Sequence, residues 1–365
     1  MKVSLAKCNS YSSVLKAVER SLESLGGLDK CIPPKSKVLL KPNLLQTKPI
    51  EKAVATDPAV IEAVLKLCKK QKCKIYLGDS PGYQTSEQAY KYYGLDKLAV
   101  KYNATLVDFK DSKELLYPEG KVMKHFTLPK LLDDIDLIIN LPKLKTHGMA
   151  LYTGAIKNLY GLMFGFKKSA LHFTFAKPSL FFGMVVDLYN LVNPQLNIMD
   201  AVIGMEGNGP GSGDPRKIGY IISSKNALAL DKVATKMINL DHVPMLEIAD
   251  KINPVKPEIV GDELKVIKDF KQVAHYVSVT FFLPNFLSRY IRKITRSKPI
   301  IQDNCIGCGV CVKVCPAHAI SIKNKKATIN YKKCIRCYCC HEMCPHDAVE
   351  LKKSLFKRLV KKNIR

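Results

Sequence analysis

The sequence predicts an α/β protein, with a largely parallel-sheet domain first and a small α+β domain after it. Short β-rich runs alternate with amphipathic helical stretches from residue 1 to about residue 270, which is the pattern of a parallel sheet covered by helices. Nine of the 13 cysteines then fall between Cys305 and Cys344. A length of 365 residues provides for two or three domains of roughly 100 to 200 residues each.

The composition is that of an ordinary globular chain with a strongly basic charge. Hydrophobic residues make up 47% and charged residues 25%, which argues against a disordered or fibrous protein. Lys and Arg number 58 against 32 Asp and Glu, a net charge of +26 that favours an acidic partner. Residues 1–7 lack the apolar stretch of a signal peptide. We therefore expect a cytoplasmic protein of an oxygen-poor cell, whose clustered thiols bind metal rather than form disulfides.

The elements of the first domain, residues 1–270, follow from hydrophobic spacing. The clearest strands are residues 38–40, 74–77, 137–139 and 198–203. Residues 58–70, which begin with Pro58, and residues 227–240 have the apolar spacing of helices.

Two basic segments flank the second domain. Residues 271–298 carry six Lys or Arg, no acid and several large apolar side chains. They are interpreted as a linker helix packed on a neighbouring domain, or as a helix lying on an anionic membrane surface. The apolar stretch 277–290 is broken by Pro284 and is shorter than the roughly 20 residues that span a bilayer. Residues 353–365 are predicted to form a solvated basic tail.

The cysteines between the two basic segments form a repeated motif. Cys-x2-Cys-x2-Cys-x3-Cys-Pro occurs twice, 29 residues apart. Two-residue spacers let three thiolates surround one iron–sulfur cube, and the fourth reaches the other cube. We therefore predict two [4Fe-4S] clusters, with Cys305, Cys308, Cys311 and Cys344 holding one and Cys334, Cys337, Cys340 and Cys315 holding the other. Zinc is the rival metal, but structural zinc sites use two ligand pairs separated by a longer loop.

A further thiol, Cys339, lies outside the repeat and is interpreted as a bystander rather than a substitute ligand. With the β-rich runs 319–322 and 348–351, the motif resembles the bacterial two-[4Fe-4S] ferredoxin domain over about residues 299–352. The resemblance implies low-potential, one-electron transfer.

Polar residues follow the predicted strands of the first domain. Because the ligand crevice of an open α/β sheet lies outside the carboxyl ends of its strands, we predict that these residues form one site, with simple loop capping as the alternative. Lys157 and Asn158 add cationic and amide groups suited to a carboxylate or phosphate, unless they belong to a solvated basic surface. His147 and Lys145 are the predicted catalytic proton donors. The predicted substrate-binding residues are Lys41, Asn43, Asp79, Lys143, Lys157, Asn158 and Asp200.

Five glycines in residues 204–213 are predicted to let the backbone approach a ligand or to form a surface loop. The run lacks the Lys-Ser/Thr ending of a P-loop and leads into a β-rich run rather than a helix, so neither a P-loop nor a Rossmann fingerprint is present.

The polar segments of the first domain carry a second resemblance. Leu-Lys-Pro-Asn at 40–43, Gly-Asp-Ser-Pro-Gly at 78–82, Asn-Leu-Pro-Lys-Leu-Lys-Thr-His at 140–147, Ala-Ile-Lys-Asn-Leu-Tyr-Gly at 155–161 and Asp-Ala at 200–201 are similar to the family called domain of unknown function 362. The likeness covers most of residues 1–250. It implies an iron–sulfur protein of anaerobic metabolism and leaves the reaction open.

Two functions remain open at this point. In the first, a ferredoxin-type iron–sulfur oxidoreductase delivers electrons through the clusters to a small anionic substrate or cofactor at the α/β domain. In the second, the protein is a non-catalytic electron carrier whose α/β domain docks an acidic redox partner. No helix-turn-helix, RNA-recognition or zinc-finger motif supports a nucleic-acid partner. A flavin or an additional metal is neither predicted nor excluded.

Overall fold

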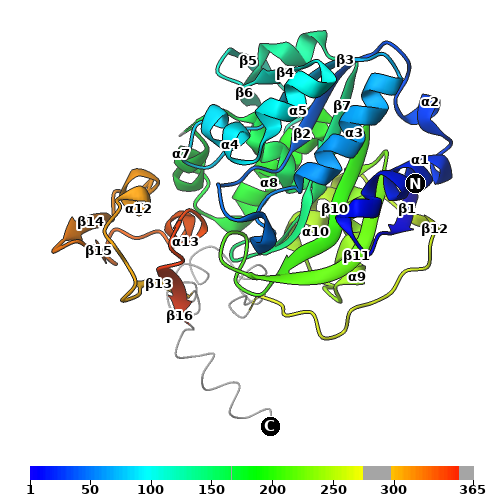
Figure 1. Cartoon of the computed structure of the whole chain (residues 1–365). Helices are drawn as coiled ribbons and strands as arrows, with labels where there is room; N and C mark the ends of the chain where they lie inside the picture. Colours follow the sequence, from blue (N-terminus) through cyan, green and yellow to red (C-terminus); the bar gives the residue numbers. More distant parts are fainter. Residues whose placement is uncertain (166, 274–296, 353–365) are drawn as a thin grey trace.

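The large domain is built on one mixed sheet that is mostly parallel (Figure 1). The computed structural model describes residues 1–165, 167–273 and 297–352. Within these residues the sheet has the strand order β12-β1-β11-β10-β7-β2-β3-β4, with β8 paired to β10 and β9 paired to β8. Its strands are β1 Lys2–Lys7, β2 Lys37–Pro42, β3 Lys74–Gly78, β4 Ala104–Val107, β7 Leu137–Leu141, β8 Lys143–His147, β9 Leu151–Thr153, β10 Leu196–Glu206, β11 Asp214–Ser224 and β12 Glu258–Gly261.

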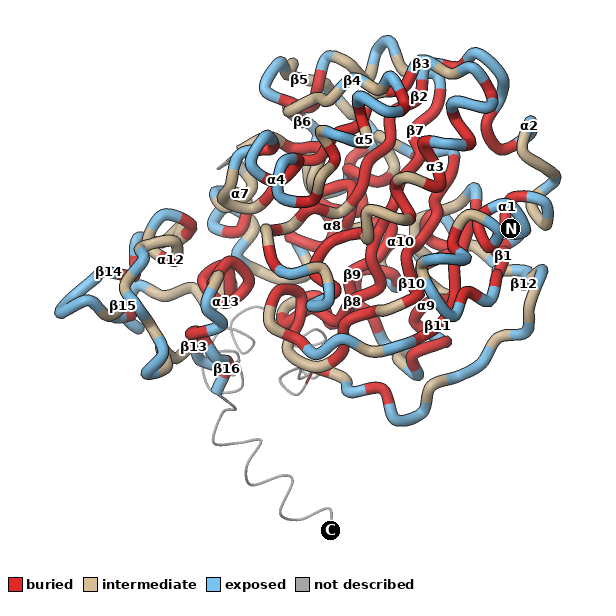
Figure 2. The backbone as a smooth tube through the Cα atoms, in the orientation of Figure 1, coloured by how far each residue is buried: buried red, intermediate tan, exposed pale blue. Residues whose placement is uncertain are grey.

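Helices cover both faces of this sheet, so its central strands are buried along their length (Figure 2). In β2, Val38 and Leu40 pack into one core and Leu39 into the other, as alternation along a strand requires. The helices are α1 Val14–Ser24, α2 Leu28–Cys31, α3 Pro58–Lys70, α4 Ser86–Tyr92, α5 Leu95–Tyr102, α6 Ala155–Asn158, α7 Lys167–Thr174, α8 Pro178–Val192, α9 Ala227–Met237 and α10 Pro244–Ile252. A hairpin of β5 Ser112–Leu116 and β6 His125–Pro129 and four 3-10 turns complete the domain, the turns being η1 Tyr11–Ser13, η2 Ile50–Lys52, η3 Lys130–Asp134 and η4 Leu159–Leu162.

The predicted α/β class is confirmed, and most predicted elements are present. The helix predicted at 58–70 is α3, whose first amide groups are capped by the Asp57 side chain. The helix predicted at 227–240 ends earlier, at Met237, because Asn239 adopts a left-handed conformation with φ of 53°. Residues 143–147 were expected to follow a strand, but they form the strand β8 and are all buried. They can remain buried because β8 pairs with β10 and β9 and its charged side chains find partners.

The small domain, called the module below, comprises residues 297–352. Its elements are β13 Lys298–Ile301, α12 Val310–Lys313, β14 Ile320–Lys323, β15 Lys326–Ile329, α13 Cys339–Glu342 and β16 Val349–Lys352. β13 pairs with β16 and β14 pairs with β15, both antiparallel. The two strands predicted at 319–322 and 348–351 are thus present, each displaced by one residue.

The module packs against the large domain through α13 and the residues around it (Figure 1). Val314, Cys339 and Met343 form an apolar cluster with Leu45 and Tyr83 of the large domain.

Polar contacts fix this docking. Gln46 Nε2 donates to the backbone oxygen of Glu342 at 3.2 Å. Asp347 pairs with Lys48 and hydrogen-bonds to Ser212. The module is therefore held on one side of the large domain by both apolar and polar contacts.

The predicted basic linker and tail lie largely or wholly outside the described residues, because 274–296 and 353–365 are not described. The two interpretations of the linker therefore stay predictions. In the described ranges, no helix is long and apolar enough to cross a membrane.

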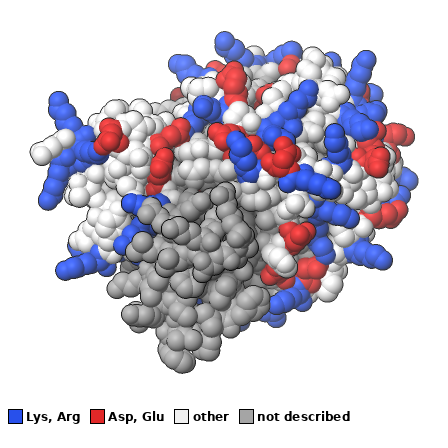
Figure 3. All heavy atoms as spheres, turned by 90° about the horizontal axis from the view of Figure 1, so that it is seen from below, with Lys and Arg blue, Asp and Glu red and all other residues white. Residues whose placement is uncertain are grey.

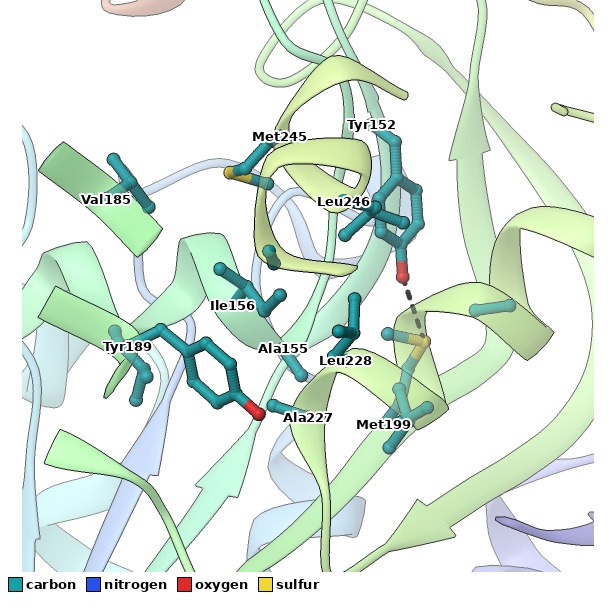
Figure 4. Close-up of a cluster of buried hydrophobic side chains, with 14 of the residues drawn as sticks. Tyr152, Ala155, Ile156, Val185, Tyr189, Met199, Ala227, Leu228, Met245 and Leu246 are labelled. Carbon is teal, nitrogen blue, oxygen red and sulfur yellow. Dashed lines mark hydrogen bonds between the residues drawn. The ribbon is translucent and has the colours of Figure 1, made fainter. Parts of the chain in front are cut away.

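The buried carboxylate of Asp231 connects the core of the large domain to the start of α6. Figure 4 shows Tyr152 pointing into an apolar cluster with its hydroxyl toward Met199. Asp231 accepts hydrogen bonds from that hydroxyl at 2.9 Å and from the amides of Ala155 and Ile156 at 2.7 and 3.0 Å. Because these two amides begin α6, Asp231 holds the start of the helix that carries Lys157 and Asn158.

We expect Asp231→Ala to destabilise the protein by about 3 kcal/mol, because three buried donors lose their acceptor. Denaturant unfolding followed by circular dichroism under anaerobic conditions measures the change. The control is Asp241→Ala at an exposed position near the end of α9, for which we expect a change within about 0.5 kcal/mol. Equal stability of the two variants would contradict this role of Asp231.

Candidate functional site

A cavity of about 100 Å³ lies between the large domain and the module. This interface cavity is bounded by the carboxyl ends of β2 and β3, by β8, α6 and α7, and by α13 of the module. From β2 the chain adds β3 and β4 on one side and β7 on the other, so the strand order reverses beside the cavity. Open α/β sheets bind ligands at such a reversal. Its polar lining consists of Lys41, Asn43, Asp79, Ser80, Lys145, His147, Thr153, Lys157, Asn158, Tyr160, Lys168, Ser169, His172, Cys339 and Glu342.

A fully buried ion pair forms the floor of the cavity. Lys41 Nζ donates to Asp79 Oδ1 at 2.7 Å, and Asp79 Oδ2 accepts from the amide of Leu44 at 2.7 Å. Burial lowers the pKa of Lys41, and the nearby Asp79 charge opposes that shift. A Cβ atom on Gly161 would lie 2.1 Å from Asp79 Oδ1, so only glycine leaves room for the pair. Lys41 and Asp79 thus neutralise each other and shape the site.

Asn158 ties this floor to the neighbouring strands. Its Oδ1 accepts from Asn43 Nδ2 at 3.0 Å and from Lys41 Nζ at 3.3 Å, and its Nδ2 donates to Asn140 Oδ1 at 2.8 Å. The amide is therefore fully engaged and positions Asn43, whose own Oδ1 faces Lys145 at 2.7 Å.

Two lysines bring positive charge into the cavity, and within the described residues neither forms an ion pair with a carboxylate. Lys145 Nζ donates to Asn43 Oδ1 and to the backbone oxygen of Val54, both at 2.7 Å, which leaves one ammonium hydrogen for the cavity. Lys157 Nζ lies over the rings of Tyr160 and Phe181 at 5.4 and 6.0 Å. Within the described part of the chain, Lys157 has no hydrogen bond or ion pair.

The electrostatics of these lysines favour an anionic ligand. Burial lowers the pKa of both ammonium groups, and the charges of Lys143 and Lys157 lower that of Lys145 further. Among the described residues, four lysines and only two carboxylates line the cavity. A small carboxylate or phosphate would supply the missing counter-charge.

His147 faces the module across the cavity. Its Nδ1 accepts from the amides of Met149 and Ala150 at 3.2 and 3.3 Å, so the neutral ring carries its proton on Nε2. Nε2 lies 3.4 Å from Glu342 Oε1 of α13. Burial, followed by the charge of Lys157, lowers the pKa of His147 well below its usual value. The ring is therefore a neutral hydrogen-bond donor.

Glu342 contributes the module's carboxylate to the cavity. Burial raises its pKa to about 7, and the charges of Lys157 and Lys145 oppose that shift.

Two predicted residues lie away from the cavity and pair with each other. Lys143 Nζ donates to Asp200 Oδ2 at 2.7 Å and to Tyr11 at 2.9 Å, and both side chains are almost fully buried. In the pairing of β8 with β10, Lys143 lies opposite Asp200, but Lys145 lies opposite Met205, so the register is irregular between them. Lys145 instead contacts Asn43 and the backbone oxygen of Val54 beside the cavity. The expectation that Lys143 and Asp200 share one site with the others is not met by their positions.

The glycine run is mostly buried rather than a surface loop, and its close approach to a ligand stays a prediction. It packs against protein backbone: Gly148 donates to the oxygen of Gly209 at 3.0 Å, and a Cβ on Gly209 would lie 2.2 Å from the oxygen of Thr146. A Cβ on Gly211 would lie 2.7 Å from the oxygen of Glu342. The glycines thus let three backbone segments meet beside the cavity, which Pro210 lines.

The donor set of the module fits an iron–sulfur cluster. A second cavity, of about 20 Å³, is surrounded by the thiols predicted to hold one cluster, Cys305, Cys308, Cys311 and Cys344, within a shell of apolar side chains. The amides of Ala327 and Ala348 donate to the sulfurs of Cys305 and Cys344 at 3.5 and 3.3 Å. Convergent thiols with amide donors are the environment that such clusters require.

The other four predicted ligands also lie close together. Burial, together with the charges of Cys337, Cys334, Cys311 and Cys315, raises the pKa of Cys340. The amide of Ala319 donates to Cys315 Sγ at 3.3 Å.

Cys339 has a place of its own. The residue is 5% exposed, its thiol interacts with that of Cys337, and it lines the interface cavity. It therefore lies where the second set of thiols meets the site of the large domain.

Some of the residues that sequence reasoning missed belong to the module. Glu342 and Met343 line the interface cavity, but no sequence pattern indicates that α13 packs there. Lys168 and His172 of α7 close another side, and Lys168 Nζ donates to the backbone oxygens of Ser80 and Pro81 at 2.5 and 2.9 Å.

The fold and the thiol-rich module define an iron–sulfur protein with an attached α/β domain, and comparison with known proteins agrees. The family described as "Domain of unknown function (DUF362)" matches residues 38–236, more than half of the chain, and the "4Fe-4S dicluster domain" matches residues 304–348. The chain therefore belongs to the DUF362 family and carries a 4Fe-4S ferredoxin-type domain. This domain supports an iron–sulfur electron-transfer role.

Two proteins illustrate the relationship. The "Thylakoid-associated protein sll1697" of Synechocystis sp. (strain ATCC 27184 / PCC 6803 / Kazusa) is 33% identical over 297 residues, which cover 78% of this chain and 92% of that protein. The lactate racemase apoprotein of Thermoanaerobacterium thermosaccharolyticum resembles the structure with a TM-score of 0.42 and 13% identity. That match covers 69% of this chain and spans 57% of the racemase chain. A structural likeness at this level carries no inference about activity.

His172 predicts a pH dependence of stability. Its ring stacks on Phe181 with centroids 4.2 Å apart, and burial lowers its pKa to about 3. Below about pH 6.5 His172 is protonated in the unfolded chain but stays neutral in the folded protein, so the free energy of unfolding falls as the pH falls. His172→Phe keeps the stacked ring and removes the titration. We expect thermal unfolding between about pH 7 and about pH 5 to show a smaller loss of Tm in the variant than in the wild type. Equal losses would show that His172 does not contribute.

Proposed function

We propose that this chain is an iron–sulfur protein with two [4Fe-4S] clusters that delivers electrons to a small anionic substrate or cofactor bound in the interface cavity. The observation that carries the proposal is that Lys157, which forms no hydrogen bond or ion pair within the described residues, lines a cavity that also borders Cys339, one residue from the predicted ligand Cys340. A cationic ligand site thus adjoins the cysteine loop of the module.

In this proposal each cluster is held by four cysteines, as the motif spacing predicts. Cys305, Cys308, Cys311 and Cys344 hold one, and Cys334, Cys337, Cys340 and Cys315 hold the other. When bound, the clusters supply one-electron transfer.

The residues of the large domain have separate tasks. Lys157 and Lys145 bind and orient the anion, because their ammonium groups retain unused donors. His147 is a neutral ring that donates a hydrogen bond from Nε2 to a ligand oxygen. The proton-donor role predicted from the sequence is thus assigned to this one ring atom. Leu45 and Met343 exclude water from the side that faces the module.

The volume of the cavity favours a small ligand. About 100 Å³ is well below the roughly 300 to 1,000 Å³ of pockets that hold drug-sized molecules, so a carboxylate or phosphate of a few atoms fits better than a flavin.

The alternative function is a non-catalytic electron carrier whose α/β domain docks a redox partner. The name of the Synechocystis relative supports contact with a membrane surface, and residues 271–298 are the proposed point of contact. We propose a cytoplasmic protein with such peripheral contact.

Anion binding tests the first function. We expect inorganic phosphate or acetate to bind the cluster-loaded protein in calorimetric titrations, and Lys157→Met to weaken binding by at least tenfold, because a charge-assisted hydrogen bond contributes roughly 1.5 to 3 kcal/mol. Lys236→Met, at an exposed position of α9, removes the same charge and should leave binding unchanged. If neither probe binds, or if both variants bind like the wild type, the anion site is disproved.

Iron counting tests the cluster assignment. Anaerobically purified wild-type protein and Cys339→Ala should each contain about eight iron and eight sulfide. Cys337→Ala should lose about half of its iron and sulfide, because Cys337, unlike Cys339, is a predicted ligand. Electron paramagnetic resonance of the dithionite-reduced proteins identifies the remaining cluster. Loss of iron in Cys339→Ala would make Cys339 a ligand, and zinc in place of iron would overturn the proposal.

A further inference from the structure

The outer end of the module exposes an apolar patch beside one of the two sets of thiols. Ile306 is 62% exposed and Ile322 is 38% exposed, and both line the cavity that Cys305, Cys308, Cys311 and Cys344 surround. Cys308 is itself exposed, whereas the other seven predicted ligands are buried or half-buried. We call Ile306, Cys308 and Ile322 the outer patch. At this surface a partner can come closest to a ligand thiol.

Lysines border the outer patch. Lys323 ends β14, Lys325 lies in the turn before β15, and both are exposed. Neither forms an ion pair within the described residues, whereas Lys326 is neutralised by Asp303 at 2.7 Å. The turn adjoins the patch, because a Cβ on Gly307 would lie 2.5 Å from the backbone oxygen of Lys325. Figure 3 shows Lys and Arg side chains gathered at this end of the module, at the left of the view.

An apolar centre with a charged rim is the usual composition of a protein interface, and a small patch suits the limited area of transient redox complexes. The rim here is positive, so a complementary partner is negative. The outer patch is also separate from the interface cavity, whose lining includes Cys339, Glu342 and Met343 of the module but none of the three patch residues.

We propose that the outer patch is the docking surface for an acidic one-electron carrier protein. The carrier loses one electron and the module gains one, and no bond forms or breaks. This inference rests on the proposed function only in requiring that the module hold its clusters. It assigns the outer patch to the partner and the interface cavity to the small ligand.

The test uses the cluster-loaded full chain and a small acidic flavodoxin as the probe. Lys323→Glu/Lys325→Glu reverses the charge beside the patch. Lys236→Glu/Lys251→Glu makes the same change in net charge at exposed positions of α9 and α10. Iron counting of all three proteins comes first. Wild-type protein without iron would refute the proposed function, whereas the binding results below concern the docking surface alone.

Binding of the oxidised proteins is the first readout. At low ionic strength we expect the dissociation constant for flavodoxin to rise about tenfold in Lys323→Glu/Lys325→Glu and to change much less in the control variant. At high salt the three proteins should converge, because screening removes the interaction between exposed charges.

The rate of cluster reduction is the second readout. Prereduced flavodoxin should reduce the first variant about tenfold more slowly than the wild type at low salt. Photoreduced deazaflavin, a small reductant that needs no docking surface, should reduce all three proteins equally. Unchanged binding and rate in the first variant, or equal losses in both variants, would overturn the proposal.

Discussion

The buried ion pair between Lys41 and Asp79 is the constraint on which the site depends. The two side chains are 0% and 3% exposed, and removing one charge of such a pair typically costs about 3 to 5 kcal/mol. Asp79 also holds the amide of Leu44, at the start of the loop that leads to Gln46 and Lys48. Because those two residues contact the module, one ion pair links the ends of β2 and β3 to the docking of a separate domain.

Strand-end reasoning found much of this site but could not resolve its pairing. Lys41, Asn43, Asp79, Lys145 and His147 were predictable, because neighbouring parallel strands bring their carboxyl ends together. Lys143 and Asp200 satisfied the same rule, yet they pair with each other away from the cavity. Hydrophobic spacing indicates neither this pairing nor the register shift between β8 and β10. Glu342 was beyond such reasoning, because it depends on contact between two domains that are far apart in the sequence.

The positive charge of the chain acts in two physically different ways. Lys145 and Lys157 are removed from bulk water, so burial lowers their pKa. An anion that enters the cavity would stabilise their charged forms. Lys323 and Lys325 are exposed to water, and their charges act over a distance that salt limits. A net charge of +26 therefore predicts an acidic partner but does not distinguish lysines that bind a ligand from lysines that attract a protein.

The small size of the module's core has a consequence for the life of the protein in the cell. Eight buried residues, three of them cysteines, form its main apolar cluster, so bound metal would contribute much of the stability of the module. Since α13 supplies Glu342 and Cys339 to the interface cavity, the proposed ligand site would be complete only once cluster assembly has ordered the module. In the proposed function, cofactor insertion would act as a maturation checkpoint, so that immature copies do not sequester the proposed ligand.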